Sequence, residues 1–276
     1  MENLKIKEIK ASLIITKSNL PEADYVINPY TGCMHSCIYC YARFMKRFTG
    51  HKEQWGEFID VKINAPDLIP EKTSKYKGKS IFLSSVTDPY LPLERNYQLT
   101  RKILEKLIPL QPNVGIQTKS DLILRDIDLL KKFKSCEAGI TITALNDDLR
   151  KEIEPFTSSA ENRIKALKKL HENGIRTYVF IGPILPFLTD WKDIILKTRE
   201  FADFYMFENL NVFGTVGDSV KIWLKEKHPN LLEKYEDIYF SKGSYWDEVE
   251  DEIKKFCIKE KIDFKIYFHH SKERKG

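Results

Sequence analysis

The sequence predicts an α/β fold, a partial (β/α)6 TIM-like barrel followed by a C-terminal helical extension, and three observations carry this prediction. Short apolar runs rich in β-branched and aromatic residues alternate with longer amphipathic runs. Six such strand-then-helix units follow one another within 276 residues, which favours a parallel sheet curled toward a barrel. Polar residues also gather at the ends of the predicted strands. An open doubly wound sheet remains the alternative.

The predicted strands are the six apolar runs, at residues 25–30, 81–88, 113–120, 137–143, 176–184 and 204–211. Between them, apolar residues recur at helical spacing over 103–108, 123–133 and 164–170. The third of these helices is expected to begin at a capping box of Ser158 and Glu161 and to end at Asn173 and Gly174. Ser120 is expected to cap the helix after the third strand.

The whole chain, residues 1–276, is expected to form a single domain, with a core over about 22–215 and a helical extension over about 216–276. The extension alternates acids and lysines and then reaches FKIYFHH, which predicts helical covering and a last strand. His269, His270 and the final KERKG are expected to be an exposed tail. Cys136 and Cys257 are interpreted as packing thiols.

Composition limits the class of protein. Hydrophobic residues make up 42% and charged residues 31% of the chain, and no apolar run approaches the roughly 18 to 20 residues that span a bilayer. The first residues, MENLKIKEIK, carry no apolar stretch behind their charges. Five cysteines, three of them clustered, do not suggest a disulfide framework. We therefore expect a cytoplasmic protein without a membrane partner.

The net charge of +5 comes from 45 basic and 40 acidic residues, a mild bias that is not typical of a dedicated nucleic-acid binder. The placement of the charge is more informative than its size. Basic residues outnumber acids between Ala42 and Ile81. A solvated surface and a phosphate-contacting patch both explain that excess, so it leaves a nucleic-acid partner open.

Cys33, Cys37 and Cys40 are spaced as CxxxCxxC directly after the first predicted strand. Thiolates are soft ligands suited to zinc or to iron–sulfur clusters. A structural zinc would need a fourth ligand, for which His35 or His51 are the candidates. A cubane cluster has four irons, so three cysteines leave one iron free for a ligand that the protein does not supply.

The motif CMHSCIYC resembles the cluster motif of the radical S-adenosylmethionine (radical SAM) enzymes. The stretches NPYTGCMHSCIYCYAR, SSVTDPYLPLE and IEPF are similar to the branch named for spore photoproduct lyase, a DNA repair enzyme, and the likeness covers most of residues 8–215. The resemblance implies a 4Fe–4S cluster on the three cysteines and S-adenosylmethionine on the open iron. It further implies reductive cleavage to a 5′-deoxyadenosyl radical, with electrons from a reduced flavodoxin or a ferredoxin-like donor.

The resemblance also implies cofactor contacts at the strand ends. Tyr39 should lie beside the adenine, and Thr87, Lys119 and Thr141 fall where the branch binds S-adenosylmethionine. A lysine ammonium can meet the methionine carboxylate, and hydroxyl groups on neighbouring strands can bind carboxylate or ribose. Ser85 and Thr143 complete the predicted cofactor set; the choice between Thr141 and Thr143 stays open, since one of them could simply point into the barrel.

One position departs from the repair enzyme. That enzyme has a cysteine that donates a hydrogen atom to product, and Ser85 stands at the matching position here. The O–H bond of serine is too strong for that task. Tyr39 and Tyr41 could serve as a radical relay or could be packing aromatics, and Asp88 and Glu208 are candidates for substrate contact, although acids at strand ends also cap helices.

Three functions therefore remain. The first is a radical SAM enzyme of the spore photoproduct lyase type that acts on nucleic acid, in DNA lesion repair or base modification, with the target base flipped out of its stack. The second is radical modification of a peptide or small metabolite, which the missing cysteine favours. The third is a non-enzymatic electron-transfer or sensor protein, which the polar strand ends disfavour. The oligomeric state is left open.

Overall fold

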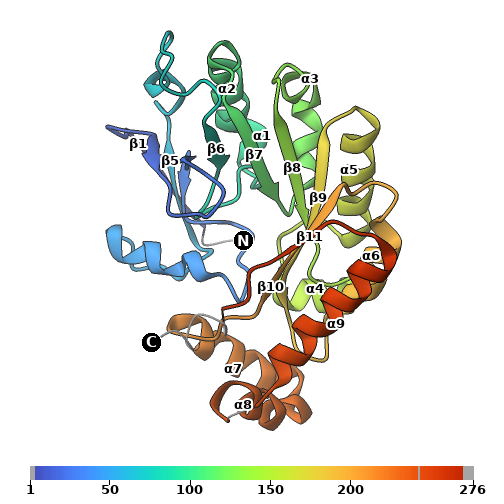
Figure 1. Cartoon of the computed structure of the whole chain (residues 1–276). Coiled ribbons are helices and arrows are strands. Elements are labelled where there is room, and N and C mark those ends of the chain that lie inside the picture. Colours follow the sequence, from blue (N-terminus) through green and yellow to red (C-terminus); the bar gives the residue numbers. More distant parts are fainter. Residues whose placement is uncertain (1–3, 242, 270–276) are drawn as a thin grey trace.

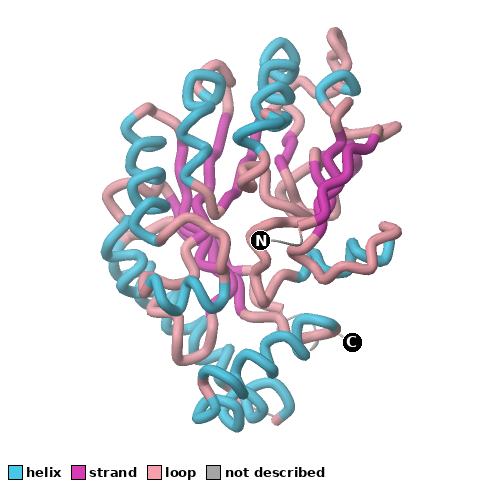
Figure 2. The backbone as a smooth tube through the Cα atoms, turned by 180° about the vertical axis from the view of Figure 1, so that it is seen from behind, coloured by secondary structure: helices cyan, strands magenta, loops and turns pink. Residues whose placement is uncertain are grey.

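The computed structural model describes residues 4–241 and 243–269, and its centre is a curved sheet with helices along its outer face (Figures 1 and 2). The spatial order of the eight strands is β11-β10-β9-β8-β7-β6-β3-β2. Neighbours from β3 to β11 pair in parallel, and β2 pairs antiparallel with β3. The strand bounds are β2 Ile15–Lys17, β3 Tyr25–Ile27, β6 Ser80–Leu83, β7 Asn113–Thr118, β8 Cys136–Thr141, β9 Arg176–Ile184, β10 Phe204–Asn209 and β11 Phe264–Ile266.

The partial barrel is confirmed, and the sheet does not close on itself. The strand β9 has the predicted bounds, but β6 ends at Leu83, well before residue 88. Ser84 has a φ of 68°, in the left-handed region, so the backbone leaves the sheet there and the polar stretch behind it becomes a loop. The first predicted strand is also divided, because only β3 belongs to this sheet.

A second sheet, with the order β1-β5-β4, was not predicted. Its strands are β1 Lys5–Ile9, β5 Phe58–Lys62 and β4 Tyr30–Thr31. Gly32 follows β4 with a φ of +92°, and a Cβ there would lie 2.3 Å from the carbonyl oxygen of Phe58. Only glycine can make this turn. The turn delivers the chain from the small sheet into the cysteine segment.

The α-helices connect the strands and cover the sheet (Figure 1). Their bounds are α1 Glu94–Tyr97, α2 Leu99–Leu107, α3 Ile127–Leu130, α4 Asp147–Ile153, α5 Ala160–Glu172, α6 Trp191–Thr198, α7 Thr215–Lys227, α8 Leu232–Phe240 and α9 Tyr245–Glu260. The 3-10 helices are η1 Tyr41–Phe48, η2 Pro66–Leu68, η3 Ile108–Leu110, η4 Asp121–Asp126 and η5 Pro229–Leu231. Within the described ranges, none of the helices has the length and apolarity needed to cross a bilayer.

The helix caps test two predictions. Ser120 accepts a hydrogen bond from the amide of Leu122 at 3.3 Å, so the predicted cap is confirmed. The predicted cap at Ser158 is wrong by one residue. The side chain of Ser159 caps α5 instead, because the Ser158 hydroxyl donates to Asp121 at 2.8 Å.

The C-terminal part returns to the sheet. The helices α7 and α8 lie below the sheet in Figure 1, and α9 runs back along it. Trp246, Ile253 and Cys257 of α9 join the main hydrophobic core, so α9 is part of the packed body. The expected last strand is present as β11. His269 is half-buried and its Nε2 lies 3.0 Å from Glu208, so the expectation of exposure is wrong for this residue, while residues 270–276 lie outside the described residues.

The two edges of the large sheet are joined by side chains. Glu22 lies in the turn between β2 and β3, and its carboxylate is 2.6 Å from the ammonium of Lys265 on β11. The hydroxyl of Tyr267 donates to the same carboxylate at 2.6 Å. Glu22 precedes β3, and Lys265 pairs with the early part of β10. The tie therefore lies at the end of the sheet opposite the carboxyl ends of the strands.

Candidate functional site

The cysteine segment, residues 33–40, lies at the carboxyl ends of the parallel strands and is held by contacts from three directions. The Thr87 hydroxyl, from the loop after β6, donates to the carbonyl of Gly32 at 2.6 Å. The amide of Ile38 donates to the carbonyl of Ile153 at the end of α4 at 3.0 Å. The guanidinium of Arg43 donates to the carbonyls of Cys37 and Ile38, each at 3.0 Å. These bonds fix the backbone of the segment.

The three thiols face the protein interior. Cys33 and Cys37 are buried and Cys40 is half-buried. Burial raises the pKa of the Cys37 thiol to about 12, with smaller contributions from neighbouring charges. The free thiols are therefore protonated at neutral pH, and binding of a metal group would release their protons.

The donor set fits a cubane cluster better than a zinc ion. In the described part of the chain, no three Cys, His, Asp or Glu side chains converge on one point as a single ion requires. A cubane accepts each thiolate on a different iron, so it needs separated sulfurs. His51 is unavailable as a fourth zinc ligand, because its ring nitrogens lie 2.9 Å from Asp60 and 3.1 Å from Glu53. Three thiols could thus hold a cluster with one open iron.

Asp88 connects the loop after β6 to the end of β7 and to the cysteine segment. Its carboxylate accepts from the Thr118 hydroxyl at 2.6 Å and from the amides of Tyr90 at 2.8 Å and Lys119 at 3.0 Å. His35 lies 3.4 Å from the same carboxylate. Burial would raise the pKa of Asp88, but His35 and these hydrogen bonds outweigh it and lower the pKa to about 2. The carboxylate is therefore ionised, and its hydrogen bonds and its ion pair are all made to groups of the protein.

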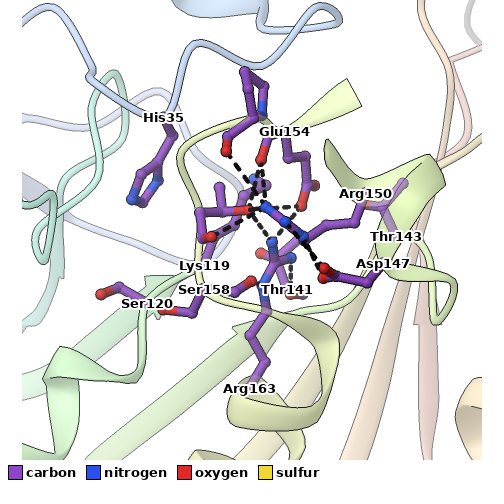
Figure 3. A network of polar contacts seen from close by, with 12 residues as sticks. His35, Lys119, Ser120, Thr141, Thr143, Asp147, Arg150, Glu154, Ser158 and Arg163 are labelled. Carbon is purple, nitrogen blue, oxygen red and sulfur yellow. Dashed lines mark hydrogen bonds and ion pairs between the residues drawn. The ribbon is translucent and has the colours of Figure 1, made fainter. Parts of the chain in front are cut away.

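A buried ionic network underlies the end of β8 (Figure 3). Glu154 is fully buried, and its carboxylate pairs with the guanidinium of Arg163 on α5. The hydroxyl of Tyr39, from the cysteine segment, donates to the same carboxylate. Burial would raise the pKa of Glu154, but Arg163 and Lys119 outweigh it and hold the pKa below its ordinary value. Glu154 therefore carries a negative charge directly beneath the cysteine segment.

Lys119 follows β7 and extends over the cysteine segment. Its ammonium lies 5.7 Å from the centroid of the Tyr39 ring, within the range of a cation–π contact. Burial would lower the pKa of Lys119, but the negative charge that Cys37 carries when ionised and the carboxylates of Glu154 and Asp88 outweigh it and raise the pKa. A charged amine thus stands beside the thiols, where it can meet an anionic ligand.

Thr141 and Thr143 differ in what their hydroxyl groups do. The Thr143 hydroxyl donates to the carbonyl of Gly182 at 3.1 Å and lies 3.4 Å from the Tyr39 hydroxyl. The Thr141 hydroxyl is buried and has no hydrogen-bond partner within the described residues. A buried hydroxyl without a partner carries a desolvation penalty. The end of β8 therefore offers one hydroxyl that a bound ligand could satisfy, and it belongs to Thr141.

Ser85 and Tyr41 form the outer part of the site. The Ser85 hydroxyl accepts from the side-chain amide of Asn28 at 3.3 Å, and the Ser85 carbonyl accepts from the hydroxyl of Tyr41. The Tyr41 side chain is 56% exposed, so its ring is reachable from solvent while its hydroxyl is held at the end of β6. The arrangement joins the loop after β6 to the start of η1. Glu208, at the end of β10, is instead paired with His269.

Sequence reasoning missed Glu154 and Arg163. The motif IEPF was noted, but no role was assigned to its acid. A signal was present in α5, where Arg163 occupies a core-facing position in line with Ala160, Leu167 and Leu170. A charged residue in an apolar helical stripe requires a buried partner. That partner can be identified only from the tertiary structure, because Glu154 lies outside α5, directly after the end of α4.

Comparison with models of protein families shows to which superfamily the chain belongs. The family model described as the radical SAM superfamily matches residues 27–198. The chain belongs to the radical SAM superfamily. Members of this superfamily use a 4Fe–4S cluster and S-adenosylmethionine, which are therefore the cofactors of this radical SAM enzyme.

Known proteins similar to this radical SAM enzyme include an uncharacterized protein of Methanocaldococcus jannaschii. It is 47% identical over 254 residues, which cover 91% of this chain and 94% of that protein. Spore photoproduct lyase complexed with dinucleoside spore photoproduct superposes with a TM-score of 0.65 at 16% identity, covering 95% of this chain and 82% of that one. SuiB of Streptococcus suis bound to the precursor peptide SuiA superposes with a TM-score of 0.55 at 16% identity, covering 88% and 48%. Both structural likenesses concern the fold.

Proposed function

We propose that Cys33, Cys37 and Cys40 ligate the cluster, and that Lys119 and Thr141 hold S-adenosylmethionine at its open iron. The observation that carries this proposal is the buried Thr141 hydroxyl without a partner, on a strand next to the one that Lys119 follows. When bound, the cluster and S-adenosylmethionine supply one-electron cleavage of the sulfonium, which yields methionine and a 5′-deoxyadenosyl radical.

The surrounding residues position these groups. The Lys119 ammonium would meet the methionine carboxylate, and the ring of Tyr39 would lie beside the adenine. Glu154 holds the Tyr39 hydroxyl, which fixes the position of the far end of the ring. Thr87 anchors the cysteine segment through Gly32. Asp88, with all its contacts inside the protein, acts as a positioning residue that sets the backbone of Lys119.

We propose nucleic acid as the substrate, in lesion repair or base modification. The similar fold of spore photoproduct lyase, whose structure holds a dinucleoside, supports this choice, as does the basic excess between residues 42 and 81. A base would have to leave its stack to approach the buried thiols. Tyr41, whose hydroxyl is bound at Ser85, is the proposed hydrogen-atom donor where the repair enzyme has cysteine, because a phenolic O–H bond is weaker than that of serine. The phenoxyl radical left on Tyr41 would return to tyrosine by taking one electron from the reduced flavodoxin or ferredoxin-like donor and one proton from solvent.

The second candidate is a peptide substrate. Ser85 favours it, because the chain lacks the cysteine on which the repair reaction depends. The structure of SuiB, bound to a precursor peptide, shows that a related fold can take such a substrate.

The test measures 5′-deoxyadenosine released by anaerobically reconstituted, dithionite-reduced protein, beside a Cys40→Ala variant. Release that depends on Cys40 supports the cluster assignment, and equal release from both proteins contradicts it. Single-stranded DNA, duplex DNA, RNA and unstructured peptides are then added separately. Stimulation by a nucleic acid alone supports the proposed substrate class, whereas stimulation by peptides alone supports the second candidate.

A further inference from the structure

The segment η1 exposes aromatic side chains next to the site. Tyr41 is 56% exposed, Phe44 39% and Phe48 66%. Together with Arg47 they form what we call the η1 aromatic surface. Contiguous exposed apolar patches on a protein surface mark sites of interaction, whereas apolar residues scattered singly do not. Apart from Tyr41, the proposed chemistry leaves the residues of this surface without a role.

The exposed side chains of the η1 aromatic surface contact one another. The rings of Phe44 and Phe48 meet edge to face, with centroids 6.4 Å apart. The Arg47 guanidinium lies 4.7 Å from the Phe48 centroid and 5.4 Å from the Phe44 centroid. Each distance is within the range of a cation–π contact. The cation therefore holds both rings in place while leaving them accessible.

The charge of η1 is entirely positive. Residues 41–48 include Arg43, Lys46 and Arg47 and no acid. Arg43 is directed inward, to Cys37, Ile38 and Ser219. Arg47 is exposed, and Lys46 is half-buried with its ammonium bonded to the carbonyl of Lys52 at 3.0 Å, which leaves further N–H donors of Lys46 free for a ligand. Flat aromatic faces beside cations are the combination with which proteins bind single-stranded nucleic acid, through base stacking and phosphate pairing.

The position of η1 connects this surface to the reaction site. Cys40 is the residue directly before η1, and the Tyr41 hydroxyl is bound to the Ser85 carbonyl at the end of β6. A strand of nucleic acid stacked on Phe44 and Phe48 would therefore run toward the cysteine segment. In Figure 1, η1 is the pale-blue helix at the left that extends away from the body of the sheet.

We propose that the η1 aromatic surface binds a single-stranded or locally unpaired segment of nucleic acid. Bases stack on Phe44 and Phe48, and Lys46 and Arg47 pair with phosphates. The bound segment presents its neighbouring nucleotide to the site beyond Tyr41. This inference rests on the proposed nucleic-acid function and deepens it, since it specifies an unpaired strand and the residues that receive it.

The experiment measures binding of a fluorescently labelled single-stranded oligonucleotide to the reconstituted holoenzyme with S-adenosylmethionine, by anaerobic anisotropy. Phe44→Ala and Phe48→Ala are each expected to weaken binding about 5- to 150-fold, the value of one base stack. Arg47→Gln is expected to reduce the salt slope by about 0.7. Phe240→Ala, on a ring of α8 that is 78% exposed, is the matched control and should bind as wild type does. Unstimulated 5′-deoxyadenosine release should be unchanged in all four variants.

The possible results separate the two proposals. If wild-type protein binds neither DNA nor RNA, the nucleic-acid function fails and the docking inference fails with it. If wild type binds and both phenylalanine variants bind equally well, the function stands and the docking inference is overturned. If the variants bind normally but lose release only when reduced flavodoxin replaces dithionite, the surface receives the electron donor, which also overturns the inference.

Discussion

Glu154→Gln removes a buried negative charge while keeping the size and shape of the side chain. In the wild type, Glu154 and Arg163 are both almost inaccessible to solvent, and Lys119 adds a second positive charge nearby. The glutamine variant leaves both cations without their buried counterion. Its amide can still accept a hydrogen bond from Arg163, but it cannot offset the charge.

The expected destabilisation is large, because burying a charge without its partner costs about 3–5 kcal/mol. In a protein of this size that loss lowers Tm by about 6–20 °C. The effect should depend on pH. Burial would raise the pKa of Glu154, but Arg163 and Lys119 lower it below 4.5. The stabilisation is thus present at neutral pH and is lost as the pH falls through the lowered value, so the variant and the wild type should converge in acid.

Thermal and urea unfolding, followed by circular dichroism under anaerobic conditions, measure the difference. Glu161→Gln is the matched control, since it breaks an exposed i,i+4 pair with Lys165 on α5 and should leave Tm unchanged. An unfolding curve of Glu154→Gln that overlays the wild-type curve at neutral pH would refute the argument that the buried pair is held by charge.

Three further experiments test the site. Lys119→Met should weaken S-adenosylmethionine binding about 10- to 150-fold, the value of a charge-assisted bond, without loss of iron; equal affinity by equilibrium dialysis would contradict its role. Thr141→Val should lower cofactor affinity at wild-type stability. Thr143→Val should lower stability by about 0.5–1.5 kcal/mol, because it removes the hydrogen bond to the carbonyl of Gly182. The reverse pattern would exchange their roles. Gly32→Ala should abolish cluster loading measured by iron and sulfide content, because its Cβ meets backbone at 2.3 Å; Gly78→Ala, also at positive φ but with nothing within 4 Å, should load normally.

The parallel strands could be predicted from the sequence because most of their residues are buried. β8 and β9 are buried along most of their length, and β6 and β7 alternate buried and half-buried residues, so each gives a short run rich in apolar residues. The small sheet could not. Its first strand, KIKEI, is exposed along most of its length, so it carries no hydrophobic signal, and it pairs with a strand more than 50 residues later. The end of β6 was also missed, since a left-handed turn at a serine has no reliable signature in composition.

The cysteines of the site follow from their spacing, but their surroundings do not. Thr141 and Thr143 are two residues apart, and side chains in a strand alternate with a period of two. Both therefore face the same side in any sequence-based prediction, and only their hydrogen bonds distinguish them. The role of Glu154 could be recognised only from the fold. Three of its partners lie far apart in the sequence: Tyr39 in the cysteine segment, Arg163 in α5 and Lys119 after β7.

The side-chain tie between Glu22 and Lys265 bears on how an open sheet keeps its curvature. Exposed ion pairs contribute only about 0–1 kcal/mol, and this tie is the junction that the described residues provide between the β2 and β11 edges. Separating the edges at this point would break the contacts among three side chains, Glu22, Lys265 and Tyr267, and none of the strand pairings. The edges of this partial barrel are thus linked through side chains and not through a strand ladder.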